Sequence, residues 1–247
     1  MNMLKRFIAG LVISAVMLGV VDSAQAAIIH YYDFASAATD SVGGENGVLF
    51  NGATVSGGVL NLDGSDDYVE FSSHLVPTAE SYTVAFFAQQ NSSQSGLFVE
   101  MISQGTAGGT GFYIGKNSDD TVRVSDAWIW TGIPFPTVGV LHHYALTVEK
   151  SSSKSSVYID GTLAGQANVV PSAYLAGSNT RLGNQFSPYA EYFHGIIDDV
   201  RIYDSVLTAT DIANLASPTS AIPEPSSILL LVIGFAGLTC IKGVGFS

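Results

Sequence analysis

Cysteine and basic residues are both scarce in this chain. Cys240 is the one cysteine among 247 residues, and it lies in an apolar stretch near the C-terminus. A domain built from the rest of the chain therefore has no disulfide and no thiolate metal site. Nine Lys and Arg stand against 21 Asp and Glu, for a net charge of −12. Because nucleic acids are bound mainly through Lys and Arg, this balance excludes nucleic acid as an expected partner and favours cations.

Charged residues are few overall, at 12% of the chain, whereas hydrophobic residues reach 47% and glycine occupies 26 positions. Short apolar runs separated by Gly, Ser, Thr and Asn are typical of an all-β domain with many turns. We count roughly a dozen such runs, which predict an antiparallel two-sheet sandwich or jelly roll. The sequence indicates almost no helix.

The segment 195–215 is the most informative part of the chain, and it reads GIIDDVRIYDSVLTATDIANL. Its first half alternates with the period of a strand. Thr208 and Asp211 then fit a capping box, which predicts a short closing helix. Asp198 and Asp199 are neighbours within the strand, so we expect them to point to opposite faces, at least one with a specific partner. The alternative is that one is solvated and the other caps a turn.

The N-terminus has the pattern of a secretory signal. Lys5 and Arg6 precede a mostly apolar run over 7–21, and Ala24 and Ala26 stand where a signal peptidase reads small residues. We predict a signal peptide over 1–26, cleavage after Ala26, and export of the domain. The alternative is an uncleaved membrane anchor.

The C-terminus holds a second apolar segment. A linker over 217–222 is followed by Pro223, Glu224 and Pro225, then by an apolar run over 228–241 and Lys242. This tail, 223–247, resembles the PEP-CTERM sorting signal of Gram-negative bacteria, although the family usually ends in an Arg-rich cluster. The resemblance implies a membrane helix, an exosortase-type sorting enzyme as partner, an inner-membrane-anchored intermediate, and delivery to the outer envelope or extracellular matrix. The alternative is a last strand or helix of the domain.

The central part, 27–216, resembles a laminin-G-like, concanavalin A-type jelly-roll domain. The motifs that carry the resemblance occur in the family's order, and they are 32–34 with the loop 40–47, 60–69 (LNLDGSDDYV), 141–145 (LHHYA), 157–161 (VYIDG) and 195–203 (GIIDDVRIY). Leu141 stands where the family usually has Trp. The resemblance implies the fold and adjacent first and last strands.

The resemblance also implies a structural Ca²⁺, which many domains of this class hold between an N-terminal loop and the closing strand. Carboxylate and amide oxygens are the ligands that this ion takes. The candidate ligands are Asp40, Glu45 and Asn46 in the loop, with Asp198 or Asp199 in the strand. The alternative is a loop of Asx turns without an ion.

Nothing in the sequence indicates catalysis. Glucanases of this fold carry carboxylates in a pattern like E-x-D-x-x-E, because glycoside hydrolysis needs an acid and a nucleophile at a set separation. Here the pairs Asp66–Asp67 and Asp198–Asp199 are adjacent, and the former is expected to be solvated turn charge. His142 is also followed directly by another His. We therefore predict no enzymatic activity, with a glycan-active hydrolase or a passive structural matrix protein as alternatives.

Aromatic residues suggest a glycan-binding surface instead, because sugar rings stack on exposed aromatic faces. Trp128 and Trp130 are two residues apart in an expected strand over 122–130, so they would share a face. The alternative is that this pair packs in the core. A loop over 184–194 is the stronger candidate, because loops carry function on rigid sandwiches. Its aromatic residues are Phe186, Tyr189, Tyr192 and Phe193. The sequence thus predicts an exported adhesion module for a polysaccharide or a matrix protein.

Overall fold

The computed structural model describes residues 26–105, 111–125, 127–171, 179–186 and 191–217. The signal peptide expected over 1–26, except for Ala26, and the sorting tail expected over 223–247 lie outside these residues. Within the described part of the chain, no helix is both long and apolar enough to cross a bilayer.

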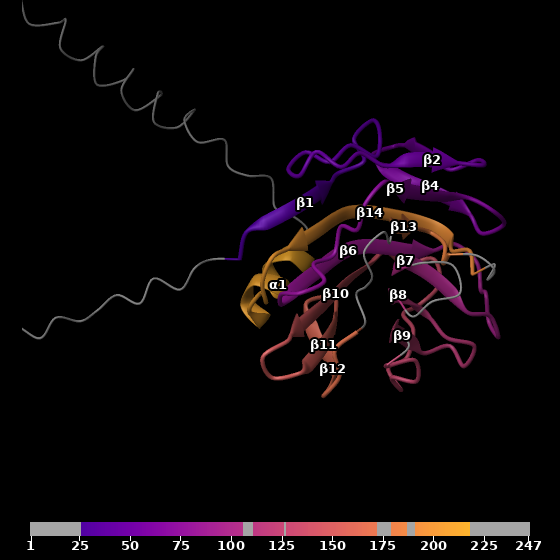
Figure 1. Cartoon of the computed structure of the whole chain (residues 1–247). Coiled ribbons are helices and arrows are strands. Elements are labelled where there is room, and N and C mark those ends of the chain that lie inside the picture. The colour runs from indigo at the N-terminus through magenta and orange to yellow at the C-terminus, as the bar shows by residue number, and fades with distance from the viewer. Residues whose placement is uncertain (1–25, 106–110, 126, 172–178, 187–190, 218–247) are drawn as a thin grey trace, which may run out of the picture.

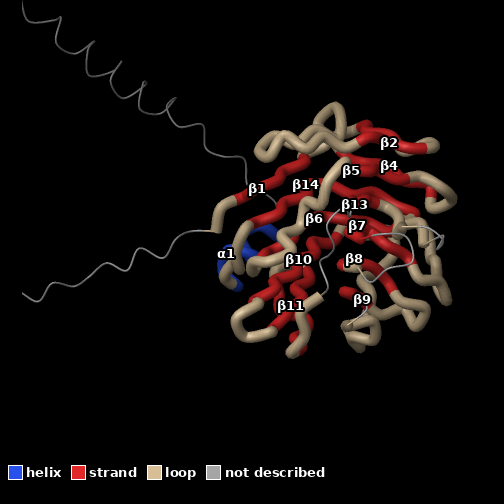
Figure 2. Tube along the Cα trace, in the orientation of Figure 1, coloured by secondary structure: helices blue, strands red, loops and turns tan. Residues whose placement is uncertain are grey.

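Two antiparallel sheets are stacked as a sandwich, as the sequence predicts (Figures 1 and 2). Sheet A contains, in spatial order, β12 (Thr162–Ala167), β11 (Lys154–Ile159), β10 (His142–Glu149), β6 (Tyr82–Gln90), β14 (His194–Tyr203), β4 (Val59–Asp63) and β3 (Thr54–Ser56). Sheet B contains β2 (Val48–Phe50), β5 (Tyr68–Phe71), β13 (Asn179–Leu182), β7 (Val99–Gly105), β8 (Phe112–Lys116) and β9 (Val122–Ser125).

The first and last strands are neighbours, which confirms the expected closure of the domain. The strand β1 (Ile28–Tyr32) pairs antiparallel with the second half of β14, and β4 pairs with its first half. The other edge of β14 pairs with β6. The closing strand therefore lies in the middle of sheet A and holds the N-terminal segment to the rest of the sheet.

The hydrophobic core fills the space between the two sheets. On β14, Ile197, Val200 and Ile202 are buried, and their neighbours along the strand are partly exposed. Tyr32 and Phe71 bring aromatic rings from the two sheets within 4.9 Å of each other. This alternation of buried and exposed side chains is the physical basis of the strand pattern in the sequence.

A single short helix, α1 (Ala209–Ala216), closes the described domain. The capping box is present: the Thr208 side chain accepts from the Asp211 amide, and the Asp211 carboxylate accepts from the Thr208 amide. Ile212 is fully buried and packs with Leu207 against the outside of sheet A. The helix therefore covers part of the outer face of that sheet (Figure 2).

Candidate functional site

The outer face of sheet B, which points away from the core, carries the main candidate site. Arg181 on β13 lies opposite Glu70 on β5 and Ser103 on β7, and Ser103 lies opposite Tyr113 on β8. Residues directly opposite each other in antiparallel strands point to the same side. The flanking Leu182 belongs to the core. These polar and aromatic side chains therefore share one outward face that spans several strands.

Arg123 forms the first cluster on this face. Its guanidinium group binds the carboxylates of both Glu100 and Glu191. It also lies over two aromatic rings, 4.5 Å from the ring centre of Tyr113 and 4.8 Å from that of Phe98. Arg123 is only 4% exposed and Glu100 is fully buried. A buried charge is tolerated when it is paired in this way, so the cluster is expected to be rigid.

Trp130 stands beside this cluster and is open to solvent. Its ring lies 6.2 Å from that of Phe98, and 61% of the residue is exposed. Trp128, in contrast, packs against the core. The prediction that both share one face of a strand over 122–130 is wrong, because β9 ends at Ser125 and the chain turns back there, with the Trp128 amide donating to the Ser125 carbonyl.

Arg181 forms the second cluster on the same face. It is ion-paired with Glu70 at 2.7 Å, and its guanidinium carbon lies 4.4 Å from the ring centres of both Tyr68 and Phe186. The Tyr68 ring stacks in turn on Phe50, with centres 4.8 Å apart and planes tilted by 8°. Phe50 is 37% exposed at the edge of the sheet. The cluster thus supports a second aromatic ring that is accessible to a ligand.

The aromatic residues predicted in the 184–194 loop have different positions. The Phe186 ring packs on the Arg181 guanidinium group. The Tyr192 backbone forms an isolated parallel β-bridge with that of Glu100. Phe193, directly before β14, points inward and is fully buried in the core. Its assignment to the ligand-binding residues is therefore wrong. Tyr189 lies outside the described residues.

The loop that was expected to hold calcium is closed by its own hydrogen bonds. The Asp40 carboxylate accepts from the His30 side chain at 2.7 Å. It also accepts from four backbone amides, those of Tyr31, Val42, Gly43 and Glu45. Burial alone would raise the pKa of Asp40, but these hydrogen bonds outweigh it and lower the pKa to about 2.

The remaining loop residues are also engaged. The Asn46 side-chain oxygen accepts from the Asp40 amide at 2.9 Å. The Glu45 carboxylate accepts from the Ser72 hydroxyl at 3.1 Å. An ion in this loop would have to displace part of this network.

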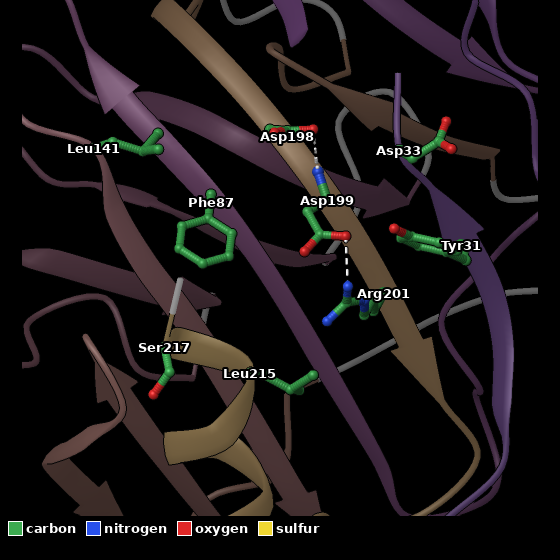
Figure 3. Close-up of a pocket in the computed structure, with 9 residues that line it drawn as sticks. All are labelled: Tyr31, Asp33, Phe87, Leu141, Asp198, Asp199, Arg201, Leu215 and Ser217. Carbon is green, nitrogen blue, oxygen red and sulfur yellow. Dashed lines mark hydrogen bonds and ion pairs between the residues drawn. The ribbon is translucent and has the colours of Figure 1, made fainter. Parts of the chain in front are cut away.

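The carboxylates expected on the closing strand line a pocket of about 360 Å³ on the outer side of sheet A, next to the end of α1 (Figure 3). A bulge between Asp198 and Arg201 interrupts the pairing with β6, and Asp199 has a φ of 53°. The expectation that Asp198 and Asp199 point to opposite faces is therefore wrong, because the extra residue of a bulge breaks strict alternation. Both line this pocket.

Within the pocket, Arg201 binds Asp199 at 2.8 Å and lies over the ring of Tyr31, 5.0 Å from its centre. Burial raises the pKa of Asp198, whose carboxylate accepts from the Asp199 amide. Asp33 also lines the pocket. Asp40, Glu45 and Asn46 do not line this pocket.

Several residues of interest were not found from the sequence. Arg123 and Arg181 lie in strands that read VRVS and NTRL, without an aromatic residue, so the local sequence carries no signal for the two clusters. His143 is 2% exposed on β10, which lies between β6 and β11 in sheet A. Its ring packs edge-on against Phe87 at 4.9 Å, and burial lowers the pKa of His143 to about 4.

Comparison with solved structures shows a similar fold in domains of several other proteins. Domain 4 of AbnA, a GH43 extracellular arabinanase from Geobacillus stearothermophilus, solved in complex with arabinotriose, is similar with a TM-score of 0.66 at 19% identity, covering 78% of this chain and 99% of that one. Trypanosoma rangeli sialidase has a TM-score of 0.57 at 14% identity over 76% of this chain and 32% of its own. The binding domain of botulinum neurotoxin serotype D has a TM-score of 0.54 at 13% identity, covering 76% and 51%.

Sequence comparisons found one curated relative and one family model that match this chain. A rat protein, "Sushi, von Willebrand factor type A, EGF and pentraxin domain-containing protein 1", is 28% identical over 162 residues, which are 58% of this chain and 4% of that protein. The chain thus matches only a small part of its relative. The Laminin_G_3 family model, described as "Concanavalin A-like lectin/glucanases superfamily", matches residues 63–213, more than half of the chain. The protein therefore belongs to the concanavalin A-like lectin/glucanase superfamily.

Proposed function

We propose that the protein binds a glycan on the outer face of sheet B, without cleaving it. The observation that carries the proposal is the exposure of Trp130 and Phe50 on a sheet face whose other rings are held by buried or half-buried arginines. Aromatic rings of this kind stack against the apolar faces of sugars. The similar arabinanase domain, whose structure contains arabinotriose, supports a saccharide as the class of ligand.

The two arginine clusters prepare this face for binding. Phe98 and Tyr68, on which the exposed rings rest, are each packed against a guanidinium group that is itself ion-paired. Rings that are already ordered lose little entropy when a ligand stacks on them. Polar groups at the cluster margins, such as Glu70, could then orient sugar hydroxyls. The face is rigid at its centre and open at its two aromatic margins.

The ion pairs also favour binding over hydrolysis. A glycosidase needs one carboxylic acid that donates a proton and one carboxylate that acts as base or nucleophile. Glu100 and Glu191 are the two acidic residues of the Arg123 cluster, and both bind the same guanidinium group. Because the same cation holds both carboxylates in their charged form, neither is suited to donate a proton. We therefore propose an adhesion role outside the cell, with a polysaccharide as the partner.

The proposal is tested by titrating the full-length chain with neutral and acidic polysaccharides, followed by affinity electrophoresis and product analysis. We expect saturable binding with no released oligosaccharide. Trp130→Ala should weaken binding by about tenfold, because tenfold corresponds to about 1.4 kcal/mol, the upper range of one aromatic stacking contact. Phe50→Ala should weaken it less, because less of Phe50 is exposed.

The matched control is Leu163→Ala, which removes an exposed side chain from β12 in the other sheet. This variant should bind as the wild type does. Equal binding by Trp130→Ala, Phe50→Ala and the wild type would refute the proposed face. Release of oligosaccharides would replace the adhesion role with a glycan-active hydrolase.

A further inference from the structure

A second acidic loop, Asp63–Asp67, has features that the predicted calcium loop lacks. It connects β4 in sheet A to β5 in sheet B, so it crosses from one layer of the sandwich to the other. One carboxylate oxygen from each of Asp63, Asp66 and Asp67 lies within 4.8 Å of the others. Three like charges at this separation repel one another, which calls for a compensating positive charge.

The local backbone gathers these carboxylates. The Asp63 carboxylate accepts from the Ser65 amide at 2.8 Å, and the Asp67 carboxylate accepts from the Asp63 amide at 3.0 Å. Gly64 has a φ of +76°, a backbone conformation that residues with a side chain rarely adopt. This conformation permits the chain to turn tightly here. The Asn51 side chain donates to the Asp66 carbonyl at 2.6 Å and ties the loop to the neighbouring turn.

Asp67 provides a second, independent observation that points to a ligand. The residue is 4% exposed, and its second oxygen, Oδ1, is buried without a hydrogen-bond partner. The Gly52 amide, which faces this carboxylate, donates to the Phe50 carbonyl at 2.9 Å. Within the described residues, none of the ion pairs of Lys, Arg or His involves Asp63, Asp66 or Asp67. A buried, unpaired carboxylate oxygen is costly unless a proton or a cation neutralises it.

We propose that Asp63, Asp66 and Asp67 bind a divalent cation, with Ca²⁺ as the best match. All of the donors are oxygens, and hard cations of this kind take carboxylates, carbonyls and water. Asp63 and Asp67 line a groove of about 250 Å³, together with the oxygen-bearing side chains of Thr54 and Asn61. The groove gives access to solvent, which supplies the remaining ligands as water.

The ion would join the two sheets at this end of the domain. Asp63 is the last residue of β4 and lies opposite His194, the first residue of β14. Asp67 directly precedes β5.

The test is a calorimetric titration of the EDTA-treated full-length chain with Ca²⁺, and in parallel with Mg²⁺, combined with thermal unfolding. We expect Ca²⁺ to bind at one site and to raise the melting temperature. Asp66→Asn should weaken Ca²⁺ binding by at least about tenfold, because one charged ligand is lost. Without metal, its melting temperature should equal or exceed that of the wild type, because the substitution relieves repulsion. A merely structural aspartate would instead lower it.

Asp33→Asn is the matched control, because the Asp33 carboxylate accepts from the Ala35 amide in the same kind of local turn. It also borders the pocket at Asp198 and Asp199. Unchanged Ca²⁺ affinity in this variant supports the proposed site. Three results would overturn it: no Ca²⁺ binding by the wild type, wild-type affinity in Asp66→Asn, or loss of binding in Asp33→Asn alone.

Discussion

The outer faces of the two sheets are held in order by different kinds of contact. Sheet A covers part of its outer face with α1, whose Ile212 is buried against small and aromatic side chains of the sheet. Sheet B, in its described part, presents Arg123 and Arg181 with their carboxylate and aromatic partners. A helix buries apolar surface, whereas ion-paired arginines keep a face ordered and still polar at its margins. Arg201 forms a similar ion pair on sheet A, but the candidate ligand surface is assigned to sheet B because Trp130 and Phe50 are exposed there.

The largest effect is expected at the centre of the sheet B face. Arg123→Met would leave the fully buried Glu100 without its cation, and breaking a buried pair in this way costs about 4 kcal/mol. Urea unfolding measures the free-energy change. The double variant Glu100→Gln/Arg123→Met should recover part of the loss. A loss below about 1 kcal/mol in the single variant would show that the cluster behaves like a surface pair.

The next effect concerns the helix on sheet A. Ile212→Ala removes the buried side chain that holds α1 to the sheet, and such truncations cost about 3 kcal/mol. Thr210→Ala, at an exposed position of the same helix, should change stability by less than about 0.5 kcal/mol. Equal losses in the two variants would mean that helix propensity, rather than burial, determines the contribution of α1. Urea unfolding distinguishes these outcomes.

The smallest of these effects depends on pH and belongs to His143 on sheet A. Its pKa in the folded protein, about 4, lies below the unfolded value of 6.5. Between these values the unfolded chain binds more protons, so stability is complete above pH 6.5 and falls as the pH drops toward 4. From pH 7 to 4.5 the wild type should lose about 2 kcal/mol more than His143→Phe. Asp40 does not contribute in this range, because its pKa is lowered to about 2 and its stabilisation is lost only below about pH 4.

Urea unfolding at the two pH values measures this difference. Parallel pH dependence in the wild type and in His143→Phe would mean that the imidazole is protonated in the fold without cost. The charged clusters of sheet B would then have to account for any acid sensitivity.

The features that sequence reasoning predicted correctly are those that short segments encode. The alternation in β14 and the capping box at Thr208 involve residues that are close in the chain, so their physics is local. The pairing of β1 with β14 came from the resemblance to a family, and the structure confirms it. The signal peptide, the sorting tail and Tyr189 stay predictions, because they lie outside the described residues.

The features that sequence reasoning missed depend on contacts between distant segments. Phe193 was predicted in a ligand-binding loop, yet it is buried in the core. Trp128 and Trp130 were predicted to share one face, yet only Trp130 is open to solvent, because β9 ends at Ser125. Asp67 was expected to be a solvated turn charge, yet it is buried by packing at the junction of the two sheets. Nothing in the local sequence distinguishes Asp67 from the exposed Asp66.

The sequence by itself determined the class of fold, the closing strand and the acidic character that directs the search for ligands toward cations and away from nucleic acids. These properties follow from the sequence because hydrophobic periodicity and net charge depend only on the residue types and their spacing along the chain. Only the tertiary structure decided which aromatic rings reach solvent, which arginines neutralise buried carboxylates and which acidic loop has an unpaired oxygen. These properties arise when sheet registers and a bulge place side chains from distant strands a few ångströms apart, and no short segment contains that information.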